Sequence, residues 1–208
     1  MRTSIRTFLM GMTAAVVLVA QTAGFAATQS VGPISINAIV GTGMTLTVVM
    51  KKNDFSGVTV TSMDFGTLQN IGTGTLRSSP TGSTGTGAVD VFLSANSHGL
   101  PYTITQTATQ LSNGITTIAG GSSTVVPVYS PADNGGAALP IGASLGTKGT
   151  WVATNKLLYQ SEGGAAAART IQAFYSITDD PAAGATTGVP LDQSGGAYSA
   201  TVTFTLTA

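Results

Sequence analysis

Residues 198–206, YSATVTFTL, decide the fold class because apolar and polar side chains alternate over their whole length. A period of two residues is typical of a β-strand that buries one face and shows the other to solvent. The opposite face of this stretch carries only serine and threonine. The residues predicted to share the apolar face are Tyr198, Ala200, Val202, Phe204 and Leu206.

The same alternation recurs toward the N-terminus, in runs separated by Gly, Pro, Asn and Ser. The predicted strands are residues 44–50, two short runs within 58–68, 88–95, 102–111, 125–129, 151–160 and 169–177. Residues 70–87 and 179–196 are predicted as loops, and residues 130–149 are predicted to be mostly loop. Pro127 confines its strand to an edge or a bulge, because proline has no N–H for a ladder. No long helical period is present, so the spacing predicts an all-β antiparallel sandwich of the immunoglobulin-like kind.

Residues 1–26 have the features of a secretory signal peptide. Arg2 and Arg6 precede an almost uncharged apolar run, and Gly24-Phe25-Ala26 offers small residues where a signal peptidase cleaves. We therefore expect cleavage after Ala26 and export of the remaining chain.

Removing 26 of the 208 residues leaves 182, with six basic and eight acidic side chains and a net charge near −2. Such a scarcity of positive charge gives no support to a nucleic-acid or anionic-lipid partner. Cysteine is absent, which excludes thiol catalysis, thiolate metal sites and disulfides. Stability must therefore come from burial and from strand pairing.

An extension over residues 27–43 precedes the predicted domain of residues 44–208. Within TQSVGPISINAIV (residues 28–40), an alternating apolar series predicts a strand with one apolar face. The members of this series are Ile34, Ile36, Ala38 and Val40. Two interpretations fit: an ordinary first strand of the sandwich, or a strand that lies in the groove of a neighbouring copy of the chain.

Residues suited to catalysis or metal binding are few. His98 is the only histidine and falls in a predicted turn, where a surface role is commoner than that of a catalytic base. Loop carboxylates could ligate calcium, but their spacing matches no EF-hand; they are Asp133, Asp179, Asp180 and Asp192. Four aromatic residues could line a sugar-binding face or pack in the core; they are Tyr129, Trp151, Tyr159 and Tyr175. We expect no enzyme activity, no cofactor and no metal site.

Four short motifs, in this order, resemble the spore coat protein U-like pilins, the subunits of archaic chaperone–usher pili. The motifs are Gly41-Thr42-Gly43-Met44-Thr45, Met63-Asp64-Phe65-Gly66-Thr67, the strand 89–93 followed by Gly99-Leu100-Pro101-Tyr102, and residues 196–206. Together they span nearly the whole chain after the signal peptide. The cysteine-free pilins related to enterotoxigenic colonisation fimbriae end in a similar strand and are a close alternative.

The chain departs from the family pattern at two cysteine positions, which are Met44 and Leu93 here, and at a common aspartate, which is Ala200 here. We expect Met44 and Leu93 to pack together in the core where the family has a disulfide.

The resemblance implies an incomplete sandwich that is completed by donor-strand complementation. Residues 34, 36, 38 and 40 would insert beside the groove-edge strand 198–206 of the next subunit. The implied partners are identical or related pilin subunits, a periplasmic chaperone and an outer-membrane usher. The implied function is that of an extracellular fimbria in adhesion and biofilm formation. The alternative is a secreted, monomeric carbohydrate-binding β-sandwich.

Overall fold

The computed structural model describes residues 28–31, 37–40, 43–52, 58–70, 72–78, 88–164 and 166–208, with only the backbone described for residues 28–31 and 37–40. The signal peptide expected over residues 1–26 lies outside the described residues, as do Ile34 and Ile36. Two short 3₁₀ turns, η1 (Gly120–Ser122) and η2 (Pro181–Ala183), are the only helical elements of the described part. None of the helices described there could cross a membrane.

The strands form two large sheets and one small sheet, and every ladder is antiparallel. The β15 sheet has the order β1 (Thr28–Val31), β15 (Val202–Thr207), β8 (Thr103–Ala108), β12 (Ala153–Gln160) and β10 (Ser144–Leu145). The β3 sheet has the order β11 (Gly149–Thr150), β9 (Ser123–Tyr129), β13 (Arg169–Ile177), β7 (Val89–Asn96), β3 (Met44–Lys52) and β2 (Asn37–Val40), with β4 (Thr59–Val60) also on β3. The small sheet has the order β14 (Val189–Pro190), β6 (Thr75–Arg77) and β5 (Gln69–Asn70).

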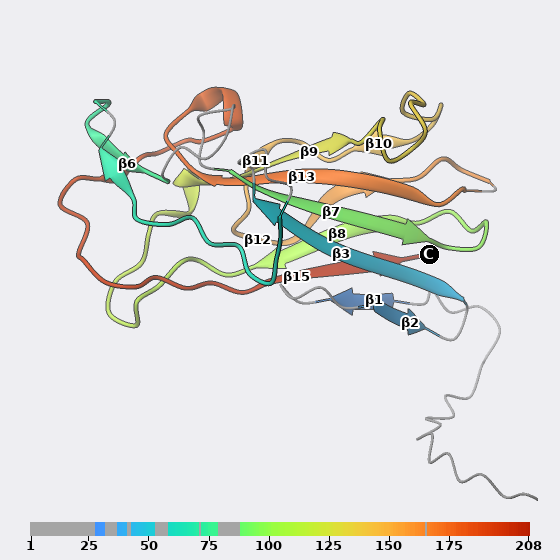
Figure 1. Cartoon of the computed structure of the whole chain (residues 1–208), viewed down its shortest axis with the longest axis horizontal. Helices are drawn as coiled ribbons and strands as arrows, with labels where there is room; N and C mark the ends of the chain where they lie inside the picture. The colour runs from blue at the N-terminus through green and yellow to red at the C-terminus, as the bar shows by residue number, and fades with distance from the viewer. Residues whose placement is uncertain are drawn as a thin grey trace, which may run out of the picture.

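One hydrophobic core lies between the two large sheets (Figure 1). Buried and partly buried residues alternate strictly along β7 and β15 and over most of β3, as the period of two predicts. Aromatic rings connect the two sheets, because Tyr175 of β13 meets Phe204 of β15 edge to face at 6.3 Å. The all-β, antiparallel fold class is confirmed, and the arrangement is consistent with a β-sandwich.

A buried polar contact also links the sheets. Gln106 of β8 is completely buried, and its amide nitrogen donates to the carbonyl oxygen of Trp151 at 2.9 Å. The hydroxyl of Tyr175 donates to the side-chain oxygen of the same glutamine. Burial raises the pKa of Tyr175 well above its usual value, so this hydroxyl keeps its proton and remains a donor. Both ends of the glutamine amide are therefore satisfied inside the core.

Pro127 is predicted to lie at an edge or a bulge, and the edge alternative is confirmed. β9 pairs with β13 along its whole length, with Pro127 opposite Ala173. On its other side β9 pairs only with the two residues of β11, opposite Thr124 and Val125. Pro127 therefore lies on an edge where no described strand needs its missing N–H.

The predicted loops are wrong in part. The stretches 70–87, 130–149 and 179–196 contain β6, β10, the first of the two residues of β11, and β14. These strands are two or three residues long, and so short a pairing leaves no periodic pattern in a sequence. The last strand is also shorter than predicted, since ladder pairing begins at Val202 and not at Tyr198.

The register of β3 on β7 corrects the core pair expected to replace a disulfide. Met44 and Leu93 are both fully buried, but the residue opposite Leu93 is Val48. Val48 is four positions beyond Met44, and four residues of a strand span about 13 Å. Met44 and Leu93 therefore share the core without forming a cross-strand pair.

Candidate functional site: the seam between the two sheets

The two large sheets both end along one side of the molecule. Without the N-terminal segment, β15 would be the edge strand of one sheet and β3 would be the edge strand of the other along residues 44–47. We call these two adjacent outer edges the seam. Edges of this kind carry unpaired backbone groups and invite another strand unless something covers them.

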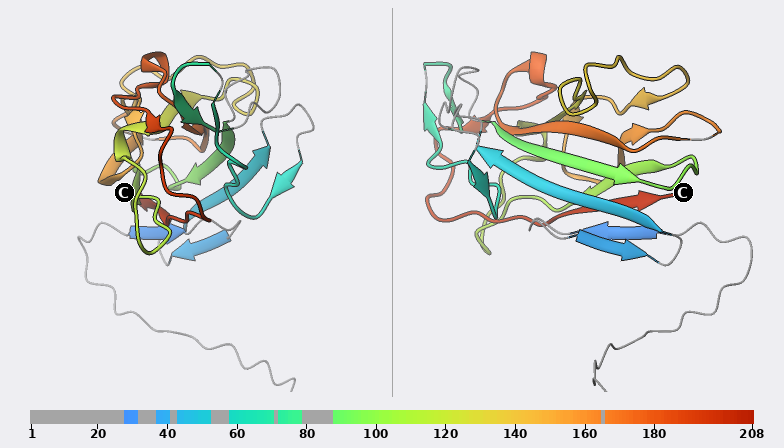
Figure 2. Two further views of the ribbon diagram at one scale, coloured as in Figure 1. Left: turned by 90° about the vertical axis from the view of Figure 1, so that its left-hand side faces the viewer. Right: turned by 45° about the vertical axis from the view of Figure 1, so that its right-hand side comes forward.

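The N-terminal segment of the same chain covers the seam in two pieces. β1 pairs with β15 from Thr28 opposite Thr207 to Val31 opposite Phe204. β2 pairs with β3 from Asn37 opposite Thr47 to Val40 opposite Met44. β1 contacts both β2 and β3, and the arrows of β1 and β2 point in opposite directions below the sandwich (Figure 1). The second orientation in Figure 2 shows the same side-by-side placement.

Some of the residues predicted for the donor strand and the groove edge lie at the seam, and others do not. Val202, Phe204 and Leu206 are buried on β15, whereas Tyr198 and Ala200 precede the strand and are partly buried against the core. Ala38 is the register partner of Leu46, and Val40 that of Met44, both within the same chain. Ile34 and Ile36 lie outside the described residues.

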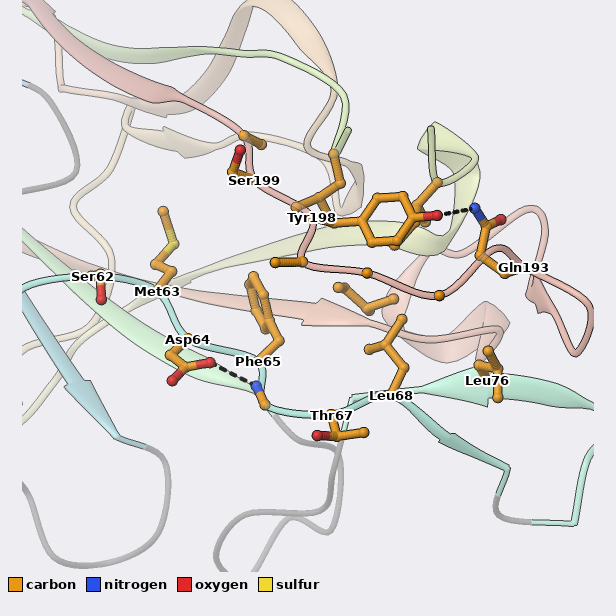
Figure 3. Close-up of a pocket in the computed structure, with 18 of the residues that line it drawn as sticks. Ser62, Met63, Asp64, Phe65, Thr67, Leu68, Leu76, Gln193, Tyr198 and Ser199 are labelled. Atoms are coloured by element: carbon orange, nitrogen blue, oxygen red, sulfur yellow. Dashed lines mark hydrogen bonds between the residues drawn. The ribbon is translucent and has the colours of Figure 1, made fainter. Parts of the chain in front are cut away.

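A cavity of about 740 Å³ opens where the seam continues beyond the end of β1. One wall is the segment 62–68 and the other is the segment 193–200 with Val202 (Figure 3). Much of the lining is apolar; these residues include Met63, Phe65, Leu68, Leu76, Leu111, Ile118, Trp151 and Ile177. The cavity thus lies along the line of β15, beyond the end of β1.

The walls of the cavity are held by local hydrogen bonds. The Tyr198 hydroxyl accepts from the Gln193 amide at 2.7 Å, donates to the Ser194 carbonyl at 2.7 Å and lies 2.7 Å from the Thr116 hydroxyl. On the other wall, Asp64 accepts from the backbone N–H of Gly66 at 2.8 Å, which confirms the predicted bend. Both walls are therefore preformed.

The small sheet closes one end of the cavity through Leu76. Its middle strand is anchored by Asp179, which forms an ion pair with Arg77 and accepts from the Thr75 hydroxyl at 2.5 Å. Burial acts to raise the pKa of Asp179, but the hydrogen bond from Thr75 and the Arg77 charge outweigh it and lower the pKa below its usual value. The carboxylate form therefore stabilises this end of the site.

Comparison with known proteins finds no matching family model, no matching curated protein and no matching solved structure. The function of this chain must therefore be inferred from its own residues and their geometry. The seam and its cavity are the candidate functional site.

The residues considered for catalysis or metal binding are not brought together. His98 is exposed in a turn with a φ of 53°. Asp133 accepts from the Ser130 hydroxyl at 2.6 Å, and Asp180 accepts from the Ala182 N–H at 2.8 Å at the start of η2. In the described part of the chain, no group of three or more His, Cys, Asp or Glu side chains could hold a metal ion.

The four aromatic residues considered for a sugar-binding face are all buried, with exposed fractions of 6% or less. Trp151 lies between Phe65 and Tyr175 at ring distances of 5.1 and 5.6 Å. Burial raises the pKa of Tyr159 to about 12. All four are core residues, and of the four only Trp151, which is 1% exposed, also lines the cavity.

Two parts of the site are not predicted from the sequence. The pairing of Thr28–Val31 with β15 is one of them, because TQSV has no apolar alternation that predicts a strand. The wall formed by residues 193–197 was missed because it lies in a predicted loop. Tyr198 was the one available signal, since its alternation with Ala200 and Val202 predicts the adjoining apolar face.

Proposed function

We propose that this protein is a structural subunit of an extracellular fibre, polymerised by donor-strand complementation. The main support for the proposal is that the N-terminal segment covers the seam. The segment before Met44 lies on the outer edges of β15 and β3, where the two sheets would otherwise end. Such strand addition to an open edge is a known mode of assembly for pilins.

Each chain has one N-terminal segment and one seam, so the segment can cover its own seam or that of a neighbour. A segment placed on a neighbour makes a head-to-tail contact in which two different surfaces meet. Repetition of such a contact without closure builds a fibre. The fully buried isoleucines of an inserted segment would each contribute roughly 1.5–3 kcal/mol, in addition to the backbone ladder.

The accompanying route follows from the resemblance and is part of the proposal. Residues 1–26 direct export, a periplasmic chaperone protects the seam, and an outer-membrane usher delivers the subunits to the cell surface. The fibre serves adhesion and biofilm formation. The carbohydrate-binding alternative loses its aromatic platform, because the four rings considered for it are buried.

The test compares Ile36→Asp with Ile39→Asp in the full exported chain. Ile36 belongs to the apolar series, and Ile39 lies on the opposite face of the same extended segment. We expect Ile36→Asp to abolish fibres in electron micrographs while leaving export unchanged, because it places an unpaired carboxylate in the groove. Ile39→Asp should leave most fibres. Normal fibres from Ile36→Asp would refute the donor-strand assignment.

A further inference from the structure

The register of β1 on β15 does not suit the apolar series of the N-terminal segment. Val202, Phe204 and Leu206 are the buried residues of β15, so the core-facing positions there are even-numbered. β1 pairs Gln29 with Leu206 and Val31 with Phe204. A strand that continued in this register would place the even-numbered residues 34 and 36 opposite Thr201 and Ser199. Residues directly opposite each other share a face of the sheet, so the isoleucines would lie on the wrong face.

A shift by an odd number of residues corrects this mismatch, because each one-residue slip moves a strand's side chains to the other face. A shift of five residues places the apolar residues of the N-terminal segment opposite the apolar residues between Ala200 and Leu206. The pairs are then Ile34 with Leu206, Ile36 with Phe204, Ala38 with Val202 and Val40 with Ala200. The segment therefore has two mutually exclusive registers on the same edge.

A chain cannot adopt the shifted register on its own β15. Val40 is four residues from Met44, a reach of at most about 14 Å. β3 begins at the end of the sandwich where β15 ends (Figure 1). Ala200 is seven residues back from Thr207, or about 23 Å along the strand. Only the segment of a second copy can therefore place Val40 opposite Ala200.

The cavity lies along this second path. Val202, Ala200 and Tyr198 form one of its walls, beyond the point where β1 ends opposite Phe204. β2 of the same chain does not extend into it, since Asn37–Val40 run back along β3 to Met44. An extended strand from another copy would continue past Phe204 and bring its residues 38–40 to the cavity.

We propose that residues 28–40 form a switch between two pairings. In the free subunit Thr28–Val31 and Asn37–Val40 form β1 and β2 and close their own seam. In the fibre the same residues are fully extended on a neighbour's β15, shifted by an odd number of residues, and fill the cavity. This inference rests on the proposed function and adds the register, the occupant of the cavity and a self-closed form that restrains assembly.

Cysteine pairs test the register cleanly because the chain has no cysteine of its own. Thr203 lies on the outward face of β15, between the buried Val202 and Phe204. We would combine Thr203→Cys with one further substitution: Ser35→Cys, Asn37→Cys, Ile34→Cys or Ile36→Cys. The full chain is refolded at high concentration, assembled and oxidised, and the products are separated on a non-reducing gel.

The shifted register predicts disulfide-linked ladders of chains for positions 35 and 37, because odd-numbered residues then share the outward face with Thr203. Positions 34 and 36 should give no ladders. Fibres with ladders at 34 or 36, or at none of the four positions, would overturn the shifted register while leaving the proposed fibre intact. If the unsubstituted chain forms no fibres, the proposed function itself fails and this inference with it.

A second pair tests the self-closed form. Thr28→Cys with Thr207→Cys joins two residues that are opposite each other in one chain. We expect the oxidised variant to be a disulfide-closed monomer whose fibre yield falls at least tenfold, and reduction to restore the yield. Undiminished polymerisation of the closed monomer would overturn the restraining role.

Discussion

The β7–β13 ladder and the seam are built from the same alternating pattern but are paired in different ways. β7 lies between β3 and β13, and β13 lies between β7 and β9, so both strands are paired on both sides within the domain. At the seam, β15 is paired with β8 over six residues and with β1 over only four. Leu93 and Phe204 are equally buried, so burial alone does not show whether a strand is paired firmly on both sides.

The largest effect is expected from a substitution in the central β7–β13 ladder. Leu93→Ala should lower the free energy of unfolding by roughly 2–5 kcal/mol, because it leaves a cavity among residues that cannot collapse around it. Denaturant-induced unfolding of the full chain measures the change. Ile115→Ala is the matched control: Ile115 is 92% exposed, so a change within about 0.5 kcal/mol is expected. Equal losses for the two variants would contradict the described core.

The next largest effect is expected when the N-terminal segment that covers the seam is removed. A chain truncated to residues 44–208 should lose on the order of 2 kcal/mol relative to the chain with residues 27–43, after the cost of ordering the segment is subtracted. A synthetic peptide of residues 27–43 should restore the thermal stability of the truncated chain. The same peptide should not rescue Leu93→Ala in the full chain. A truncated chain that is fully stable and ignores the peptide would refute an open seam.

The smallest effect concerns the end of the cavity. Asp179→Asn removes the ion pair with Arg77 and should cost about 1 kcal/mol or less at neutral pH. The folded-state pKa of Asp179 is lowered, so its contribution is present above the unfolded pKa of about 4 and is lost as the pH falls through the lower folded value. Unfolding curves of the two proteins should therefore converge on acidification. A stability difference that stays constant down to pH 2 would contradict this role of the carboxylate.

The regular part of the fold was predictable because its strands carry long alternating runs. β3, β7 and β15 each show the period of two in their burial, and the predicted edge position of Pro127 follows from its missing N–H. The short strands β6, β10, β11 and β14 were not predictable, since two or three residues carry no period. The same limit hid the small sheet that closes the cavity.

The candidate site was predictable only as two separate parts. The alternation of residues 34–40 and of residues 198–206 indicated two apolar faces. The predicted pairing of Met44 with Leu93 was wrong. Alternation shows which face of the sheet a residue lies on, but not its position along the strand. The register is set by the whole ladder, in which Leu93 meets Val48.

The sequence by itself determined the all-β class, the identity of the apolar faces and the absence of thiol chemistry, because these follow from local residue types and their period. The tertiary structure alone decided which strands lie at the seam, where the cavity opens and which residues of the N-terminal segment pair with β15. These features arise from contacts between residues far apart in the chain. A one-residue change of register leaves the amino-acid sequence unaltered and reverses the faces of a whole strand.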